Sequence, residues 1–333
     1  DRTILQKMTF GDWISYWKEE VLQKDLMAGQ REQAAFNRVL ERSVTIAQAR
    51  SEEAAELALL PKKPSKRSLI SNLDKNKKMS NIAHTYYPQS GRLVILGAGE
   101  SGVGAAILGK DKGFDVFVSD MGQIADSYKQ ILEKEQISFE EGKHSEELIL
   151  NADLLVKSPG IPEKAPLIKQ LRSLNKPLIS EIEFAAQYTD AKLYCITGSN
   201  GKTTTTMLTY TLLKNAGLDV GLAGNIGNSF ALQVARDPHA CYVLEISSFM
   251  LDDMYHFRAD VAVILNITPD HLDRYDYKLE NYAASKMRII QNQTADDVFI
   301  YCADDEETTK ALKFTKILAQ QYPFSIRKKI EAG

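Results

Sequence analysis

Apolar and polar residues form alternating blocks from Arg92 onward, in the order expected of strands that each lead into a helix. The apolar run LVILGAG precedes helical spacing over 102–112; FDVFVSD then precedes helical spacing near 124–135, and LLVKSPG follows. Strands alternating with helices are typical of βαβ units and a parallel sheet. We therefore predict an α/β fold whose first domain, over 79–189, is Rossmann-like and ends after the helical segment EIEFAAQY.

A second series of strands and helices follows a predicted domain boundary near Thr189. An apolar strand over Leu193–Thr197 runs into a Gly-rich turn and a Thr-rich helix, and YVLEISS and VAVILNIT are two more apolar runs of buried-strand length. This pattern predicts a second α/β domain of the P-loop type over 190–333.

The segment 1–78 has a different pattern, with helical rather than strand periodicity. Trp13 and Trp17 lie one helical turn apart, a spacing that favours a packing face over a ligand platform. The stretch Lys62–Lys78 holds seven basic residues and one acid among prolines and serines, which favours a solvated linker over a nucleic-acid-binding tail. We predict a helical extension and a basic linker.

Composition narrows the function classes. With 333 residues, of which 44% are hydrophobic, the chain can bury about two cores. Beyond the first 78 residues it holds 26 Lys and Arg against 33 Asp and Glu, which argues against a nucleic-acid partner. No run reaches the roughly 20 apolar residues of a membrane span, and Cys195, Cys241 and Cys302 lie far apart in apolar runs that favour reduced, buried thiols. We expect a cytoplasmic protein.

The first motif with a chemical meaning is the glycine pattern Gly97–Gly102, directly after a strand. Asp120 closes the next strand, 18 residues beyond the last glycine. Glycines let the backbone approach a diphosphate at a helix N-terminus, and the acid can accept hydrogen bonds from a ribose or base. The motif predicts a nucleotide diphosphate without specifying which one, and by itself it would favour an NAD enzyme.

The second motif, Gly198–Thr203, has the same strand–loop–helix setting but is shorter than the Walker A pattern. Successive N–H groups can hold phosphate oxygens, Lys202 can bring positive charge to the β- and γ-phosphates, and the Thr203 hydroxyl can bind Mg²⁺. We interpret it as a phosphate-binding loop for ATP.

Further chemical candidates lie at predicted strand ends. Glu245 falls within an apolar strand, where a buried carboxylate needs a partner such as a metal ion. His271 follows the next strand, and Lys286 lies 15 residues later in a predicted helix. In isolation each would be read as a structural residue. Beside a phosphate loop they become site candidates, because open α/β sheets bind ligands at the carboxyl ends of their strands.

The succession TGSNGKTT, GNIG at Gly224–Gly227, LEISSF, NITPDHLDRY and the lysine of YAASKMR resembles the muramyl ligases, or Mur ligases, over about residues 90–330. The Gly-rich, Rossmann-like first domain differs from the later-acting members, and SPGIP at Ser158–Pro162 and NITPDHLDRY are similar to the members that add D-glutamate. The resemblance implies a monomeric ligase of peptidoglycan synthesis that uses ATP and two Mg²⁺ ions. ATP would phosphorylate the terminal carboxylate of UDP-N-acetylmuramoyl-L-alanine, and the D-glutamate amine would attack the acyl phosphate to form the amide.

The resemblance also implies residue roles. Lys202 would neutralise phosphate charge, Thr203 and Glu245 would hold one Mg²⁺, His271 would help to hold a second, and Lys286 matches the family's carbamylated lysine, a metal ligand. ATP would be bound by Gly198, Ser199, Asn200, Gly201, Lys202, Thr203 and Thr204. The nucleotide-sugar substrate would be bound by Gly99, Ser101, Asp120, Ser158, Gly160, Asn225 and Ser247.

Two departures from the family pattern keep alternatives open. Met250 stands where the family usually has glutamine. We also expect Gly333 to fall inside the central domain, so that the third domain of the family is absent from this chain. Met79 is a candidate start of the ligase portion. The alternatives are a nucleotide-binding fragment or fusion without turnover, another Mur ligase such as the L-alanine-adding one, and an NAD-dependent dehydrogenase, which leaves TGSNGKTT unexplained.

Overall fold

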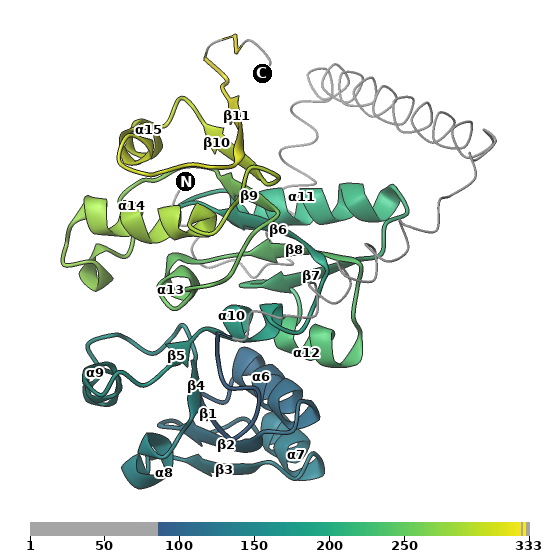
Figure 1. The fold of residues 1–333 in the computed structure, drawn as a ribbon, viewed down its shortest axis with the longest axis vertical. Coiled ribbons are helices and arrows are strands. Elements are labelled where there is room, and N and C mark those ends of the chain that lie inside the picture. The colour runs from purple at the N-terminus through teal and green to yellow at the C-terminus, as the bar shows by residue number, and fades with distance from the viewer. Residues whose placement is uncertain (1–85, 328, 331–333) are drawn as a thin grey trace, which may run out of the picture. The chain divides into compact units, whose positions relative to one another are not determined.

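The computed structural model describes residues 86–327 and 329–330, and all the elements below belong to one compact unit over Ala83–Gly333. The predicted extension and linker over 1–78, with the Trp13 and Trp17 face, lie outside these residues. Within the described part, two parallel sheets with their helices confirm the α/β class (Figure 1).

The first sheet has five parallel strands in the order β3-β2-β1-β4-β5. Central β1 alternates its side chains between the two faces: Leu93 and Ile95 enter one apolar cluster, and Val94 and Leu96 enter another. A parallel strand covered on both faces is apolar throughout, which explains why LVILGAG stands out in the sequence. The strands are β1 Arg92–Leu96, β2 Asp115–Asp120, β3 Ser138–Glu141, β4 Leu154–Lys157 and β5 Leu178–Ile179.

Helices cover both faces of this sheet. Ile149 of α8 and Ile168 of α9 pack with the cluster that holds Val94 and Leu96, whereas α6 packs in the cluster of Leu93. The helices are α6 Glu100–Asp111, α7 Asp126–Lys134, α8 Glu146–Leu150, α9 Pro166–Ser173 and α10 Glu181–Ala186. The helices expected over 102–112 and near 124–135 correspond to α6 and α7.

The second sheet has six parallel strands in the order β11-β10-β9-β6-β8-β7, so that β6 lies between β8 and β9 (Figure 1). The strands are β6 Lys192–Thr197, β7 Val220–Gly224, β8 Cys241–Glu245, β9 Val261–Ile264, β10 Val298–Cys302 and β11 Gln320–Phe324. Parallel strands end at the same edge, so the segments after β6, β8 and β9 are brought together there.

The helices of this second series are α11 Lys202–Asn215, α12 Phe230–Arg236, α13 Ser248–Leu251, α14 Leu279–Met287 and α15 Glu306–Leu312. Two 3₁₀ turns, η2 Leu272–Arg274 and η3 Arg288–Ile290, flank α14. The hydroxyl of Ser229 accepts from the Leu232 N–H at the start of α12, and Ser247 does the same for Met250 at α13. Such caps satisfy N–H groups that a helix start leaves unpaired.

Polar and small side chains join the two sheets through α6, α10 and α12. The Ser229 N–H donates to Glu100 (3.0 Å) and its hydroxyl to buried Glu181 (2.7 Å). Gly104 of α6 lies so close to Ser229 that a Cβ there would fall 2.0 Å from its hydroxyl oxygen. The close approach holds the two sheets in one unit.

The three cysteines lie in strands of the second sheet as free thiols, with Cys195 and Cys241 buried and Cys302 half-buried. The expectation of buried thiols therefore holds fully for the first two and in part for Cys302. Among the described residues, no helix combines the length and the apolar character needed to cross a bilayer.

Candidate functional site

The loop between β6 and α11 is shaped by two glycines with positive φ, Gly198 at 154° and Gly201 at 82°, the latter capping α11. Its buried Ser199 hydroxyl donates to the carbonyl of Thr268 and accepts from the Thr268 N–H, both at 2.9 Å. The loop after β6 is therefore fastened to the segment that follows β9.

Asn200 adds a second set of bonds to the same segment. Its N–H donates to the Asn266 side chain (2.8 Å), which donates back to the Asn200 carbonyl (3.0 Å). The Asn200 amide also donates to the Thr268 hydroxyl at 3.1 Å. Because these bonds fix the loop before any ligand arrives, its N–H groups are preorganised for an anion.

Two lysines meet at the carbonyl of Gly198. Lys202 donates to this carbonyl (3.0 Å) and to that of Ser199 (3.1 Å), and Lys286 of α14 donates to Gly198 at 2.9 Å. The Lys286 side chain is 1% exposed, and its ammonium lies 4.6 Å from the centre of the Tyr282 ring. Two amino groups at one carbonyl disfavour each other's charged form, so the positive charge of the pair rests mainly on Lys202.

The environment of Lys286 favours the neutral form of its amine. Desolvation by burial, followed by repulsion from Lys202, lowers the pKa of Lys286 to about 7, while Asp270 and Asp252 oppose the shift. Near neutral pH a large share of this side chain is therefore uncharged and nucleophilic.

Glu245 ends β8 with a carboxylate that is 1% exposed. One oxygen accepts from the side-chain amide of Asn225 (2.9 Å), and the Asn225 N–H donates to the Glu245 carbonyl (2.9 Å). The other oxygen, Oε2, is buried and has no hydrogen-bond partner within the described part of the chain. A buried carboxylate oxygen without a donor is suited to a hard cation such as Mg²⁺.

The remaining predicted ligands are more loosely arranged. Thr203 and Thr204 are exposed in the first turn of α11, and Ser247 caps α13. His271 has a left-handed backbone (φ 49°), its ring centre lies 5.2 Å from that of Phe249, and its Nε2 lies 3.6 Å from Asp270. Across residues 86–327 and 329–330, the structure gathers no three His, Cys, Asp or Glu side chains into a metal-binding group.

Met250, where the family pattern has glutamine, is 4% exposed and packs in the apolar core. The side chain therefore fills space between α13 and its neighbours and supplies no polar group to the site.

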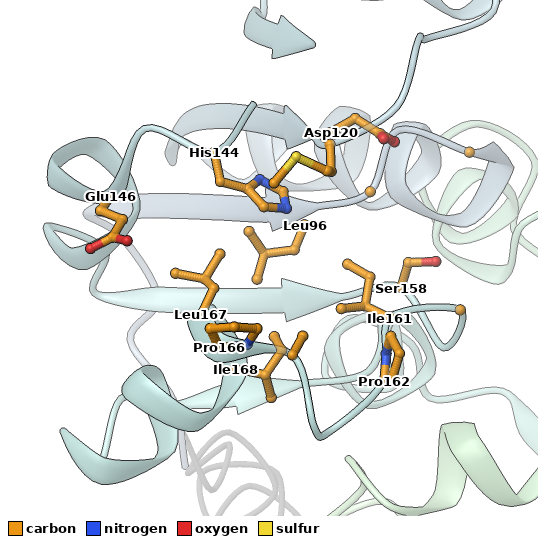
Figure 2. A pocket seen from close by; sticks show the side chains of 15 residues that line it. Leu96, Asp120, His144, Glu146, Ser158, Ile161, Pro162, Pro166, Leu167 and Ile168 are labelled. Atoms are coloured by element: carbon orange, nitrogen blue, oxygen red, sulfur yellow. The ribbon is translucent and has the colours of Figure 1, made fainter. Parts of the chain in front are cut away.

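A cavity of about 540 Å³ lies at the carboxyl end of the first sheet, beside the Gly97–Gly102 turn (Figure 2). Four of the residues predicted to bind the nucleotide sugar line it, namely Gly99, Asp120, Ser158 and Gly160, whereas Ser101 is not among the lining residues. The Asp120 carboxylate accepts from the N–H groups of Ala98 and Gly122, both at 2.7 Å, so it holds the turn in shape.

His144 also lines this cavity and was not singled out from the sequence. It follows β3, and its Nδ1 lies 2.7 Å from the hydroxyl of Ser119. Desolvation by burial lowers the pKa of His144, against the opposing effect of Glu140 and Asp120. Its position just after a strand of a βαβ series was the available signal, because ligands collect at that edge.

Arg274 joins the two parts of the site. Its guanidinium donates to the carbonyls of Pro159 (3.0 Å) and Gly160 (2.9 Å), in the loop that borders the cavity, and lies 4.2 Å from the centre of the Phe249 ring. Arg274 is three residues from His271, so a bond to one loop also restrains the other.

Comparison with known families gives two matches in chain order. The MurD N-terminal domain matches residues 92–166, and the Mur ligase middle domain matches residues 196–332. The first match contains the glycine turn and most of the cavity lining, and the second contains most of the phosphate-loop site.

Individual relatives agree with these matches. The chain is 62% identical over 234 residues to the UDP-N-acetylmuramoylalanine--D-glutamate ligase of Bacteroides fragilis, covering 70% of this chain and 53% of the relative. It is 57% identical over 234 residues to the ligase of that name from Porphyromonas gingivalis, covering 70% and 52%. The chain thus spans about half the length of the curated relatives it matches.

Among solved structures, the chain is similar to the UDP-N-acetylmuramate:L-alanyl-gamma-D-glutamyl-meso-diaminopimelate ligase from Neisseria meningitides. The TM-score is 0.50 at 20% identity, with 69% of this chain and 77% of that chain covered. At this identity the likeness supports the fold.

Proposed function

Because the chain belongs to the Mur ligase family, we propose that it carries the nucleotide-sugar pocket and the phosphoryl-transfer site of a D-glutamate-adding ligase of peptidoglycan synthesis. The observation that carries the proposal is the pair of lysines at the Gly198 carbonyl, next to a preorganised Gly-rich loop. Relatives named UDP-N-acetylmuramoylalanine--D-glutamate ligase, at 54–62% identity, support the choice of amino acid.

The proposed reaction has two steps. The terminal carboxylate of UDP-N-acetylmuramoyl-L-alanine attacks the γ-phosphorus of ATP, so that an acyl phosphate forms and ADP leaves. The amine of D-glutamate then attacks the acyl carbon, and the amide forms as phosphate leaves and the amine loses a proton. Because the first step brings two anions together, it requires concentrated positive charge.

The chain's own residues provide that charge and the orientation. Lys202 exchanges its loop carbonyls for phosphate oxygens, and the N–H groups of Gly198–Thr204 bind the phosphates. Asn225 and Ser247 lie after β7 and β8, where we propose that they position the muramoyl-alanine portion. At the other end, Gly99, Ser101, Asp120, Ser158 and Gly160 form the proposed uridine diphosphate pocket.

The buried, unpartnered Oε2 of Glu245 fits a divalent cation. We propose that Thr203 and Glu245 hold one Mg²⁺, and that His271 and Lys286 help to hold a second. When bound, Mg²⁺ would neutralise charge on the phosphates. A neutral Lys286 amine can add to CO₂ and release a proton, which turns it into a carbamate with the oxygens that Mg²⁺ prefers. By family likeness, we also propose a cytoplasmic monomer.

A second candidate is a nucleotide-binding protein without turnover. The relatives at 54–62% identity, which are D-glutamate ligases by name, do not favour it. Addition of another amino acid, such as L-alanine, is less well supported, because the relatives at 54–62% identity are D-glutamate ligases by name.

The test is phosphate release from ATP in the presence of UDP-N-acetylmuramoyl-L-alanine, with and without D-glutamate. It compares this chain, the chain extended by the C-terminal half of the Bacteroides fragilis relative, and the extended chain with Lys202→Ala. We expect turnover that needs both substrates in the extended chain and at least 100-fold less in the variant. Absence of turnover in a folded extended chain would contradict the proposal, and turnover with L-alanine instead would correct the amino acid.

A further inference from the structure

The cavity beside β1 contains a histidine whose hydrogen-bonding role is fixed by groups behind it. Ser119 is fully buried at the end of β2, and its hydroxyl contacts both Glu140 of β3 (2.7 Å) and Nδ1 of His144 (2.7 Å). The three side chains form a row that starts inside the protein and ends at the cavity wall.

The protons in this row can be placed one by one. Desolvation disfavours a charge on Glu140, but hydrogen bonds from the N–H and hydroxyl of Ser145 and from Ser119 outweigh it and lower the pKa of this carboxyl. An ionised carboxylate only accepts, so the single Ser119 proton points to Glu140. The Ser119 oxygen is then left to accept a proton from Nδ1 of His144.

This arrangement leaves Nε2 of His144 as an acceptor. Burial lowers the pKa of His144, so the ring is neutral at neutral pH and carries its one proton on Nδ1. Since Nδ1 is directed at Ser119, the opposite edge of the ring faces the cavity, as Figure 2 shows. Nε2 therefore offers a fixed lone pair to any ligand in the cavity.

The rest of the cavity is suited to a flat ring at this end. Apolar side chains line much of the wall, while Asp120 and Ser158 lie at the opposite end from His144 and Glu146 in Figure 2. A nucleotide with its phosphates at the Gly97–Gly102 turn would thus place its base near His144. The apolar lining residues are Leu96, Met121, Ile161, Pro162, Leu167 and Ile168.

We propose that Nε2 of His144 accepts a hydrogen bond from the imide N3–H of a uracil ring and thereby selects uridine over cytidine nucleotides. The inference rests on the proposed function, from which the uridine nucleotide comes. Uracil carries a proton on N3, whereas cytosine has a lone pair there. A lone pair facing the fixed lone pair of His144 would leave two desolvated acceptors in contact, which is costly.

The test is calorimetric titration of the purified 333-residue chain with UDP and with CDP. We expect UDP to bind at least tenfold more tightly than CDP. His144→Phe keeps a flat ring without the acceptor, so UDP affinity should fall about tenfold while CDP affinity stays or rises. The matched control is Glu147→Gln in α8, three residues after His144, at an exposed position that does not line the cavity, and it should behave as the parent chain.

Two further measurements examine the row itself. The ¹⁵N chemical shifts of His144 should show a neutral ring protonated on Nδ1 in the ligand-free chain. Ser119→Ala removes the acceptor that fixes this tautomer, so it should reduce the preference for UDP over CDP while His144 is still present. Thermal melting of each variant verifies that it is folded, and loss of preference without loss of CDP binding is a result that unfolding cannot produce.

The outcomes separate the two proposals. If the parent chain binds UDP and His144→Phe keeps the full preference over CDP, or if the ring is protonated on Nε2, the inference is wrong and the proposed function stands. If the folded parent chain binds no uridine nucleotide, the proposed function fails at its pocket and the inference fails with it.

Discussion

The chain contains the same device twice, a parallel strand that leads through a Gly-rich turn into a helix, and the two copies are packed differently. Eight of the twelve residues of α6 are buried, between the first sheet and α12. In α11 the buried residue is Thr206, and Met207, Leu208 and Leu212 are 43–48% exposed. The first turn is thus embedded in the protein, while the second is on a helix with an open side.

The charged side chains around the two turns also differ. A carboxylate, Asp120, holds the first turn by its N–H groups, and among the residues that the structure describes no lysine side chain lines the adjoining cavity. At the second turn two lysines share the Gly198 carbonyl. Under the proposed function, one backbone arrangement would serve two purposes: the first turn would hold a diphosphate that does not react, and the second would bind the phosphates of ATP, one of which is transferred.

The largest predicted difference between the two turns is in the free energy of unfolding of glycine variants. In Gly102→Ala the new Cβ would lie 1.9 Å from the Gly97 carbonyl oxygen, so α6 must move away from its own turn. We expect a loss of about 3 kcal/mol in the free energy of unfolding. Gly201→Ala in the second turn meets its nearest side chain at 3.6 Å and is strained by its φ of 82°, for a loss of about 1 kcal/mol.

Urea unfolding followed by circular dichroism measures both variants on the same chain. Equal losses in the two variants would show that the embedding of α6 has no energetic consequence, and the comparison of the two turns would then lose its basis.

The next effect concerns ligands. Lys202→Ala removes a cation from the second turn and should weaken ATP binding about 100-fold, through a charge-assisted contact, while UDP binding stays unchanged. Asp120→Asn should do the reverse, with UDP weakened about tenfold and ATP unaffected, because it disturbs the bonds to Ala98 and Gly122. Calorimetric titration measures the binding of ATP and of UDP to each variant. A variant that weakened the binding of both ligands would contradict the contrast between the two turns.

The lysine cluster should also make stability depend on pH. Lys286 has a pKa of about 7 in the folded chain and 10.5 as its ordinary value, so between these pH values the unfolded state binds the extra proton. Stability from this group therefore rises with pH, by about 1.4 kcal/mol per unit, and is lost as pH falls through 7.

Urea unfolding from pH 7 to pH 9.5, in metal-free and CO₂-free buffer, measures this slope. Lys286→Met should remove most of it, whereas Lys278→Met, at an exposed lysine close by, should leave it in place. Identical slopes for the parent chain and Lys286→Met would show that the amine is charged in the folded state.

The smallest predicted effect is a difference in stability between variants of two carboxylates, Glu245 and Asp120. Glu245 has a buried oxygen without a partner, so Glu245→Gln should stabilise the metal-free chain by about 1 kcal/mol. Asp120 has both oxygens bonded, so Asp120→Asn should destabilise it by about 1 kcal/mol. Thermal melts should also show that Mg²⁺ with ATP stabilises the parent chain more than Glu245→Gln; equal stabilisation would contradict the metal role of Glu245.

The sequence was sufficient for the α/β class because the central strands β1 and β6 are largely apolar and each is followed directly by a glycine. It therefore located β1, β6 and the two turns. It could not show that Glu245 shares its carboxylate with Asn225, because that pairing depends on β7 and β8 being neighbours in the sheet. It also could not rank His144, since a single histidine has meaning only once Ser119 and Glu140 are placed behind it.

The contact of Arg274 with the carbonyls of Pro159 and Gly160 has a consequence for substrate choice by length. It ties the rim of the nucleotide cavity to the loop of His271, so the span between the two ends of the site is set by the protein. Under the proposed function, a substrate must reach from one end to the other to react, and a nucleotide sugar with a longer or shorter arm would occupy the cavity without presenting its carboxylate. The protein would thus select its substrate by length as well as by chemical groups.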